Sequence, residues 1–140
     1  MKEQKLFTNT VLTDAKAIKI RKILLDPLQL GDWVPEIKSI RWQNSAYQII
    51  RSNSSLNSYE EITLTYKQNV IIYESNKGKL VYRLAFTLKE MNQQTQIKEE
   101  VYLIDSVYQQ LPLELINPIL QKAMQTNLDN LGLLAQGPNL

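Results

Sequence analysis

The sequence contains no histidine and no cysteine among its 140 residues. Without these side chains it has no Ser-His-Asp or Cys-His nucleophile system, no disulfide and none of the usual zinc or copper ligands. Its longest apolar runs are four or five residues, far below the roughly 20 that cross a bilayer. The start, Met1–Lys5, lacks the apolar core of a signal peptide. We therefore expect a cytoplasmic protein with no metal site, no cofactor and no integral membrane association.

Composition and charge are those of an ordinary globular chain. Apolar residues make up 44% of the sequence, charged residues make up 21%, and the net charge is +2. A charge this small and this evenly spread gives no argument for a nucleic-acid partner. The length predicts one domain over residues 1–140. We expect a monomer, or a weak homodimer that pairs through an edge strand such as 5–12.

The N-terminal part predicts a strand followed by two short helices. β-Branched and aromatic residues indicate a strand over 5–12. Apolar residues spaced three and four apart over 17–25 indicate an amphipathic helix. Asp26-Pro27 has the chemistry of a second helix start, and that helix must be short because Pro35 cannot continue it.

Six antiparallel strands are predicted between Ile37 and Asp105, where the spacing of apolar residues changes to two. Asn44-Ser45 is the expected turn of the first hairpin, and Gly78 is expected to take a positive φ in a later one. Apolar residues stand at every second position from Leu80 to Leu88, and Ile97, Val101 and Leu103 share one face of the strand that follows. One face of the sheet is therefore predicted to be apolar over most of its length.

A long amphipathic helix is predicted at the end of the chain, from about Pro118 to Gln136. Pro118 suits a first helical position, a short helical turn precedes it, and Gly137-Pro138 ends the pattern. The apolar stripe of this helix is wide enough to require a sheet to cover it. The elements together predict an α+β fold, in which a curved antiparallel sheet of about seven strands grips the terminal helix and leaves an apolar cavity between them.

The candidate ligand-binding residues come from the inner face of the sheet and from the elements opposite it. Aromatic side chains at such positions build an apolar pocket with a few hydroxyl groups, as in most small-molecule sites. The open alternative is that they only fill the core, and that the tryptophan after the short helices only anchors those helices. The candidates are Trp33, Trp42, Tyr66, Tyr82, Phe86, Leu120 and Met124.

Glu99 is the one clear ionisable residue that strand parity places on the inner face. It lies between Ile97 and Val101, so aliphatic surroundings are expected to raise the pKa of its carboxyl group. Three roles stay open at this point. Glu99 pairs structurally with a group such as Arg51 or Arg83, it orients a ligand, or it acts as a weak candidate catalytic residue.

The order of elements resembles the helix-grip arrangement of the START-like (SRPBCC) superfamily. That superfamily includes relatives of the birch-pollen allergen, polyketide cyclases and Hsp90-activator-like domains. The signals are the Asp26-Pro27 helix start, the segment Trp33-Val34-Pro35-Glu36-Ile37 that leads into a strand, and the paired strands over 79–105 before the last helix. The resemblance covers essentially the whole chain and implies a cavity for a lipid, polyketide, hormone or other apolar molecule. Asn44-Ser45-Ala46 stands where some branches carry a glycine-rich loop.

Three functions are consistent with these observations. The favoured one is non-catalytic binding or carriage of a small hydrophobic molecule in the cavity. The second is a cyclase-, aromatase- or hydrolase-like enzyme that uses Glu99 with a tyrosine, which requires Glu99 to face the cavity. The third is a protein-interaction module, similar to Hsp90-activator-like domains, in which side chains fill the cavity.

Overall fold

The computed structural model describes residues 3–53, 55–108 and 112–137. Its helices are α1 (Ala17–Leu24), the 3-10 helix η1 (Pro27–Asp32) and α2 (Leu113–Ala135). Its strands are β1 (Gln4–Thr13), β2 (Ile37–Gln43), β3 (Ala46–Arg51), β4 (Tyr59–Lys67), β5 (Val70–Asn76), β6 (Leu80–Met91) and β7 (Gln94–Ser106).

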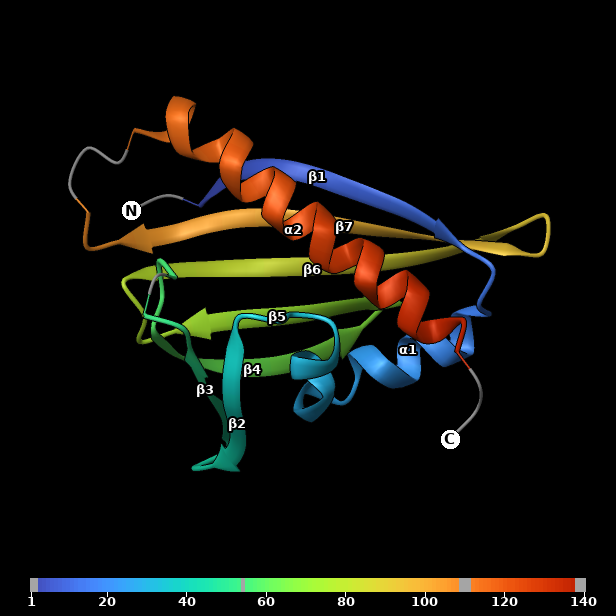
Figure 1. The fold of residues 1–140 in the computed structure, drawn as a ribbon, viewed down its shortest axis with the longest axis horizontal. Helices are drawn as coiled ribbons and strands as arrows, with labels where there is room; N and C mark the ends of the chain where they lie inside the picture. Colours follow the sequence, from blue (N-terminus) through green and yellow to red (C-terminus); the bar gives the residue numbers. More distant parts are fainter. Residues whose placement is uncertain (1–2, 54, 109–111, 138–140) are drawn as a thin grey trace.

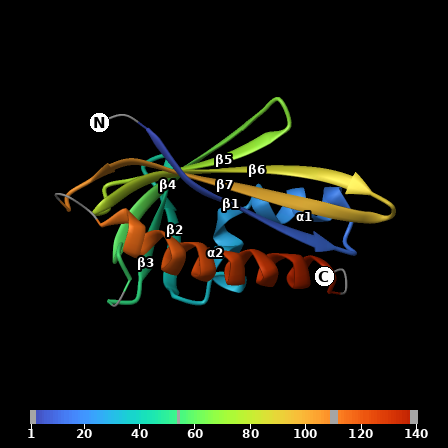
Figure 2. The same cartoon turned by 90° about the horizontal axis from the view of Figure 1, so that it is seen from above.

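The strands form one seven-stranded antiparallel sheet in the order β1-β7-β6-β5-β4-β3-β2. Helix α2 crosses one face of this sheet diagonally, and α1 and η1 lie beside the C-terminal half of α2 (Figure 1). Figure 2 shows the sheet and α2 as two separate layers. The predicted α+β helix-grip fold is therefore confirmed. None of the helices in the described residues is long and apolar enough to span a membrane.

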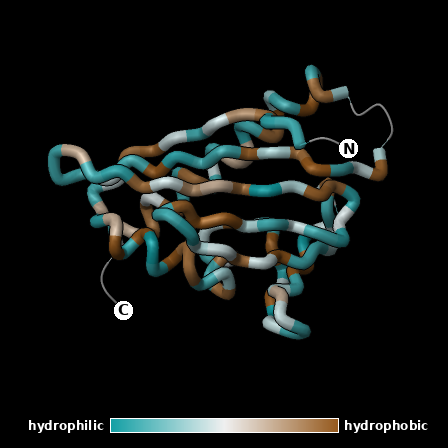
Figure 3. The backbone as a smooth tube through the Cα atoms, turned by 180° about the vertical axis from the view of Figure 1, so that it is seen from behind, coloured by the Kyte–Doolittle hydropathy of each residue, from teal (hydrophilic) through white to brown (hydrophobic). Residues whose placement is uncertain are grey.

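The two faces of the sheet differ as strand periodicity predicts. Along β7, buried residues alternate with partly exposed ones from Gln94 to Ile104. Seen from behind in Figure 3, the strands lie in front, and no helix of the described residues crosses them on this side. The sheet is therefore covered on one side only, and a cavity between sheet and helix can form only on that side.

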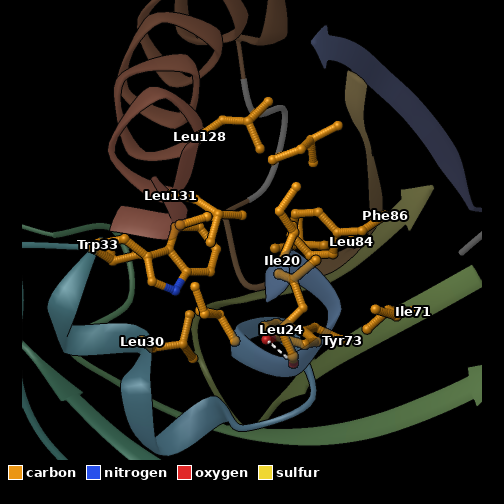
Figure 4. Packing of buried hydrophobic residues seen from close by; sticks show 14 of the residues in the cluster. Ile20, Leu24, Leu30, Trp33, Ile71, Tyr73, Leu84, Phe86, Leu128 and Leu131 are labelled. Carbon is orange, nitrogen blue, oxygen red and sulfur yellow. Dashed lines mark hydrogen bonds between the residues drawn. The ribbon is translucent and has the colours of Figure 1, made fainter. Parts of the chain in front are cut away.

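The main core lies under the C-terminal half of α2 (Figure 4). Leu128 and Leu131 of α2 are fully buried there. The Phe86 ring meets Trp33 and Tyr73 edge to face, with ring centroids 6.3 Å and 5.4 Å apart. The Tyr73 hydroxyl donates a hydrogen bond to the carbonyl oxygen of Leu24, at the end of α1. This cluster fixes α1 and η1 against the sheet, and Trp33 is part of that anchor.

Side chains of α2 also occupy the free edge of β1. Gln125 Nε2 donates to the Thr10 carbonyl oxygen at 2.9 Å, and Asn117 Nδ2 donates to the Leu6 carbonyl oxygen at 3.5 Å. Unpaired carbonyl groups at a sheet edge are the groups through which a further strand would pair. These two carbonyl groups of β1 are therefore already hydrogen-bonded to α2 and are not free to pair with another strand.

Helix α2 begins earlier than the sequence predicts. It runs without a break from Leu113, so Pro118 lies inside it rather than at its start. Proline has no N–H, so the carbonyl group of Glu114 loses its helical partner, and the helix continues past this position. The expected stop at Gly137-Pro138 falls partly outside the described residues, and α2 ends at Ala135.

Candidate ligand cavity

A cavity of about 270 Å³ lies between the inner face of the sheet and the middle of α2. The segment Trp33–Glu36, which connects η1 to β2, contributes to the same walls. Most of the lining side chains are aliphatic or aromatic. They include Ile62, Leu84, Val101, Leu103, Leu120 and Met124.

Five of the candidate residues line this cavity and three do not. Phe86 is fully buried in the core under the C-terminal half of α2. Trp42 is 57% exposed and Tyr66 is 44% exposed, which corrects the expectation that both rings line the cavity. The lining candidates are Trp33, Tyr82, Glu99, Leu120 and Met124.

The hairpin of β2 and β3 explains the exposure of Trp42. Asn44 and Ser45 both have positive φ values, 56° and 64°, and form the predicted two-residue turn. The hairpin projects beyond the region that the helices cover (Figure 1). Trp42 therefore packs on Tyr47, its partner across the hairpin, with ring centroids 4.7 Å apart, rather than on α2.

Glu99 occupies the position that strand parity predicts. It is 2% exposed and lines the cavity from the middle of β7, opposite Asn9 of β1 and Phe86 of β6. Asn9 Nδ2 donates to Glu99 Oε1 at 3.4 Å and to the carbonyl oxygen of Gln121 at 3.2 Å. Burial raises the pKa of the Glu99 carboxyl to about 8, and the bond from Asn9 only partly opposes this shift. The group is therefore mainly a neutral acid near pH 7.

Neither arginine considered as a partner of Glu99 pairs with it. Arg51 forms ion pairs with Glu36 and Glu60. Arg83 pairs with Glu3, and its guanidinium group lies over the Tyr102 ring at 4.4 Å from the centroid. Within the described ranges, no cation forms an ion pair with Glu99.

A second buried carboxyl group, Glu60, also lines the cavity. Its side chain is fully buried and accepts hydrogen bonds from four residues, which together with Glu60 we call the Glu60 cluster. Oε1 accepts from Arg51 Nε at 2.8 Å and from the Tyr82 hydroxyl at 3.0 Å. Oε2 accepts from Ser75 Oγ at 2.7 Å, from the Tyr82 hydroxyl at 2.9 Å and from Asn57 Nδ2 at 3.0 Å. Both oxygens of this carboxylate are satisfied.

The two buried carboxyl groups therefore differ in charge. Desolvation is the largest single effect on Glu60 and tends to raise the pKa of its carboxyl. The positive charge of Arg51 and the hydrogen bonds from Asn57, Ser75 and Arg51 outweigh it, so this pKa is lowered. Glu60 is ionised and held by four hydrogen-bonding residues, whereas Glu99 is neutral and accepts one long hydrogen bond, from Asn9.

Sequence reasoning missed Glu60, although its position held the signal. Glu60 precedes Ile62 by two residues in β4 and so shares its inward face. The strand begins at Tyr59, directly after a polar loop, and this early start was not evident from the pattern. A step of two residues back from Ile62 along the same face of the strand reaches Glu60 and so predicts a second buried carboxyl group.

The loop before β6 is tight because it approaches Asn57. Gly78 does not take the predicted positive φ, and Lys77 takes it instead, at 68°. A Cβ atom on Gly78 would lie 2.4 Å from Asn57 Nδ2. Asn57 cannot easily move, because its side chain also makes two hydrogen bonds to the backbone of Leu80. Its Oδ1 accepts from the Leu80 N–H at 2.8 Å, and its Nδ2 donates to the Leu80 carbonyl oxygen at 2.9 Å.

We expect Gly78→Ala to lower the free energy of unfolding by about 1–3 kcal/mol, because the added methyl group displaces Asn57 from Glu60. Urea denaturation measures the change. Gly31→Ala is the matched control, since a Cβ there meets nothing within 4 Å and should leave stability unchanged or slightly raised. Equal effects of the two substitutions would contradict this account of Gly78.

The acidic residues that the structure describes do not form a metal site. No group of three His, Cys, Asp or Glu side chains among the described residues could hold a metal ion. The cavity thus offers one neutral acid, one saturated carboxylate cluster and a largely apolar wall. These groups can bind an organic molecule by burial and a small number of hydrogen bonds.

No known family model and no curated protein match the chain, but solved structures do. A START superfamily protein from Mycobacterium smegmatis superposes with a TM-score of 0.76 at 16% identity, covering 93% of this chain and 96% of that one. The Zhui aromatase/cyclase from a Streptomyces species has a TM-score of 0.76 at 12% identity, covering 96% and 94%. A conserved protein from Geobacillus kaustophilus has a TM-score of 0.69 at 11% identity, covering 91% and 93%. The chain therefore has the START-like helix-grip fold.

Proposed function

We propose that the protein binds or carries a small hydrophobic molecule in the cavity between the sheet and α2. The observation that carries this proposal is a cavity of about 270 Å³ with mostly apolar walls. That volume lies near the lower end of small-molecule sites, which span roughly 300–1,000 Å³. It favours a compact ligand, and it counts against the alternative of an interior filled by side chains.

The alternative enzyme, in which Glu99 works with a tyrosine, has less support. Tyr82 pairs in register with Leu103, which lies four residues along β7 from Glu99. Four residues of a strand separate the two backbone positions by roughly 13 Å. Its hydroxyl donates to Glu60, and the Tyr73 hydroxyl donates to the carbonyl oxygen of Leu24. Burial raises the pKa of both phenols, so neither is poised for proton transfer near neutral pH. Carriage is therefore favoured over catalysis by a Glu–Tyr pair.

We expect the wild-type protein to bind 2-isopropylnaphthalene, an uncharged and compact hydrocarbon, and Met124→Trp to weaken this binding at least tenfold. Met124 lines the cavity from α2, so an indole at this position occupies the ligand volume. Isothermal titration calorimetry measures the affinity, and native mass spectrometry of the purified protein tests for a co-purified ligand.

The matched control for this experiment is Lys122→Trp, which places the same indole on the exposed side of α2. It should bind the hydrocarbon as the wild type does. Equal affinity of Met124→Trp and Lys122→Trp, or no binding to the wild type together with no co-purified species, would count against a ligand cavity.

A further inference from the structure

Glu99 and Glu60 line the same cavity but have different numbers of partners. The Glu60 carboxylate is held by four residues through both oxygens. In the described part of the chain, the Glu99 carboxyl receives one long hydrogen bond, from Asn9 at 3.4 Å. A buried polar group normally has its hydrogen bonds satisfied, and an exception calls for an explanation. Glu99 thus lines the cavity with a carboxyl oxygen that no hydrogen bond from the described residues reaches.

The neighbours of Glu99 define which partner is missing. Asn9 uses one N–H of its amide on Glu99 Oε1 and the other on the carbonyl oxygen of Gln121. Phe86 of β6 and the flanking residues Ile97 and Val101 offer no polar group. A neutral carboxylic acid keeps an O–H donor, which needs an acceptor. Asn9 meets Glu99 Oε1 through its Nδ2, so this contact supplies a donor and not an acceptor. The cavity that Glu99 lines is where an acceptor can be placed against the carboxyl group.

We propose that the ligand is a compact, uncharged molecule that places a hydrogen-bond acceptor, such as a carbonyl oxygen, against the Glu99 carboxyl group. This inference rests on the proposed function, since it names the chemical class that the cavity takes. The burial that makes Glu99 a neutral acid also makes its O–H the donor of this bond. The apolar remainder of the ligand contacts the aliphatic walls, including Val101, Leu120 and Met124.

Charged ligands fit the cavity less well. An anion would need a free cation, and the cavity-lining Arg51 is already shared between Glu36 and Glu60. An ammonium group at Glu99 would give up its hydration for one carboxyl and one amide in an otherwise aliphatic environment. Removal of a charge from water at this cost is unfavourable unless several hydrogen bonds replace the lost ones.

A matched series of naphthalenes at pH 6 tests this inference. The series is 2-acetylnaphthalene as the ketone, 2-isopropylnaphthalene as the hydrocarbon of similar shape, 1-(2-naphthyl)ethylamine as the cation and 2-naphthoate as the anion. For the wild type we expect the ketone to bind about five- to tenfold more tightly than the hydrocarbon, which lies within the range that one net hydrogen bond supplies. The cation and the anion should bind more weakly than the ketone.

Two variants assign the preference to Glu99. Glu99→Leu removes the donor and should weaken ketone binding about five- to tenfold, with hydrocarbon binding unchanged or tighter. Glu99→Gln keeps an N–H donor and should stay within about threefold of the wild type for the ketone. Loss of the ketone preference in Glu99→Leu with retention in Glu99→Gln supports the inference, because a general packing defect would weaken the hydrocarbon as well.

The contrary outcomes separate the two proposals. Tight hydrocarbon binding with no ketone preference, or with a preference that survives Glu99→Leu, overturns the acceptor inference and leaves the ligand cavity standing. Tighter binding of the amine than of the ketone overturns it as well, because Glu99 would then act as an anion. If no compound of the series binds and no species co-purifies with the protein, the inference falls together with the proposed function.

Discussion

Glu60→Ala is expected to lower the free energy of unfolding by about 3–5 kcal/mol, one of the two largest effects predicted for a single substitution in this chain. The change removes the carboxylate that Arg51, Asn57, Ser75 and Tyr82 all contact. Removal of one partner from a buried ion pair leaves the other charge and several donors unsatisfied. Arg51 then keeps its pair with the more exposed Glu36 and a hydrogen bond to the Tyr82 hydroxyl at 3.3 Å, but loses its pair with the buried carboxylate.

Urea denaturation of Glu60→Ala, Glu61→Ala and Arg51→Met tests this expectation. Glu61 is adjacent in β4 and pairs with Lys77, whose side chain is largely exposed, so its loss should change stability little. Arg51→Met should also destabilise, and the Glu60/Arg51 double substitution should cost less than the two single changes together. A Glu60→Ala protein as stable as Glu61→Ala would show that the cluster does not hold the fold together.

The pH dependence of the Glu60 contribution follows from its lowered pKa. A carboxyl group whose pKa is lowered on folding stabilises the protein above its unfolded pKa, about 4.5, and loses this contribution as the pH falls further. The stability lost in Glu60→Ala should therefore be largest near neutral pH and should shrink in acid.

Strand parity predicted the sheet and Glu99 because both depend on local alternation. Glu99 stands between two apolar residues of a long strand, so its inward position could be inferred from β7 alone. Glu60 lies at the second position of β4, where few residues on the same face precede it. Its partners come from β3, β5, β6 and the loop before β4, and no one-dimensional pattern brings these together.

The exposure of Trp42 and Tyr66 could not be predicted from strand parity. Trp42 shares the inner face of its strand, and its partner Tyr47 is opposite it in register, but no helix covers that part of the hairpin. Tyr66 lies near the end of β4, where the inner face also reaches solvent. Periodicity defines a face, whereas coverage depends on the length and crossing angle of α2. The cavity residues on α2, Leu120 and Met124, could be predicted because a wide apolar stripe needs a cover.

Glu99→Gln is expected to raise the free energy of unfolding by about 4 kcal/mol at pH 8, the opposite sign to Glu60→Ala. The pKa of the Glu99 carboxyl is about 8 in the folded chain and about 4.5 in the unfolded chain. Between these values the folded state binds a proton that the unfolded state has released, so rising pH favours unfolding by up to about 1.4 kcal/mol per pH unit. The amide does not ionise and removes this slope.

Urea midpoints between pH 5 and pH 9 should show the effect. Wild-type stability should fall from about pH 4.5 to pH 8 and then level off, and Glu99→Gln should lack this fall. Glu100→Gln is the control, because Glu100 lies on the other face of β7, where the hydrogen bond from Lys5 lowers the pKa of its carboxyl. A slope that persists in Glu99→Gln would show that Glu99 is not the buried acid responsible.

The combined result for Glu99 distinguishes a structural acid from a recognition group. A structural acid such as Glu60 stabilises the fold, and its removal lowers stability. Glu99 costs stability above pH 4.5, because its burial is compensated by one long bond from Asn9. If Glu99→Leu is more stable than the wild type at pH 8 and also loses the preference for 2-acetylnaphthalene, the carboxyl contributes to binding at the expense of stability. Such a trade is expected of a group whose partner is the ligand.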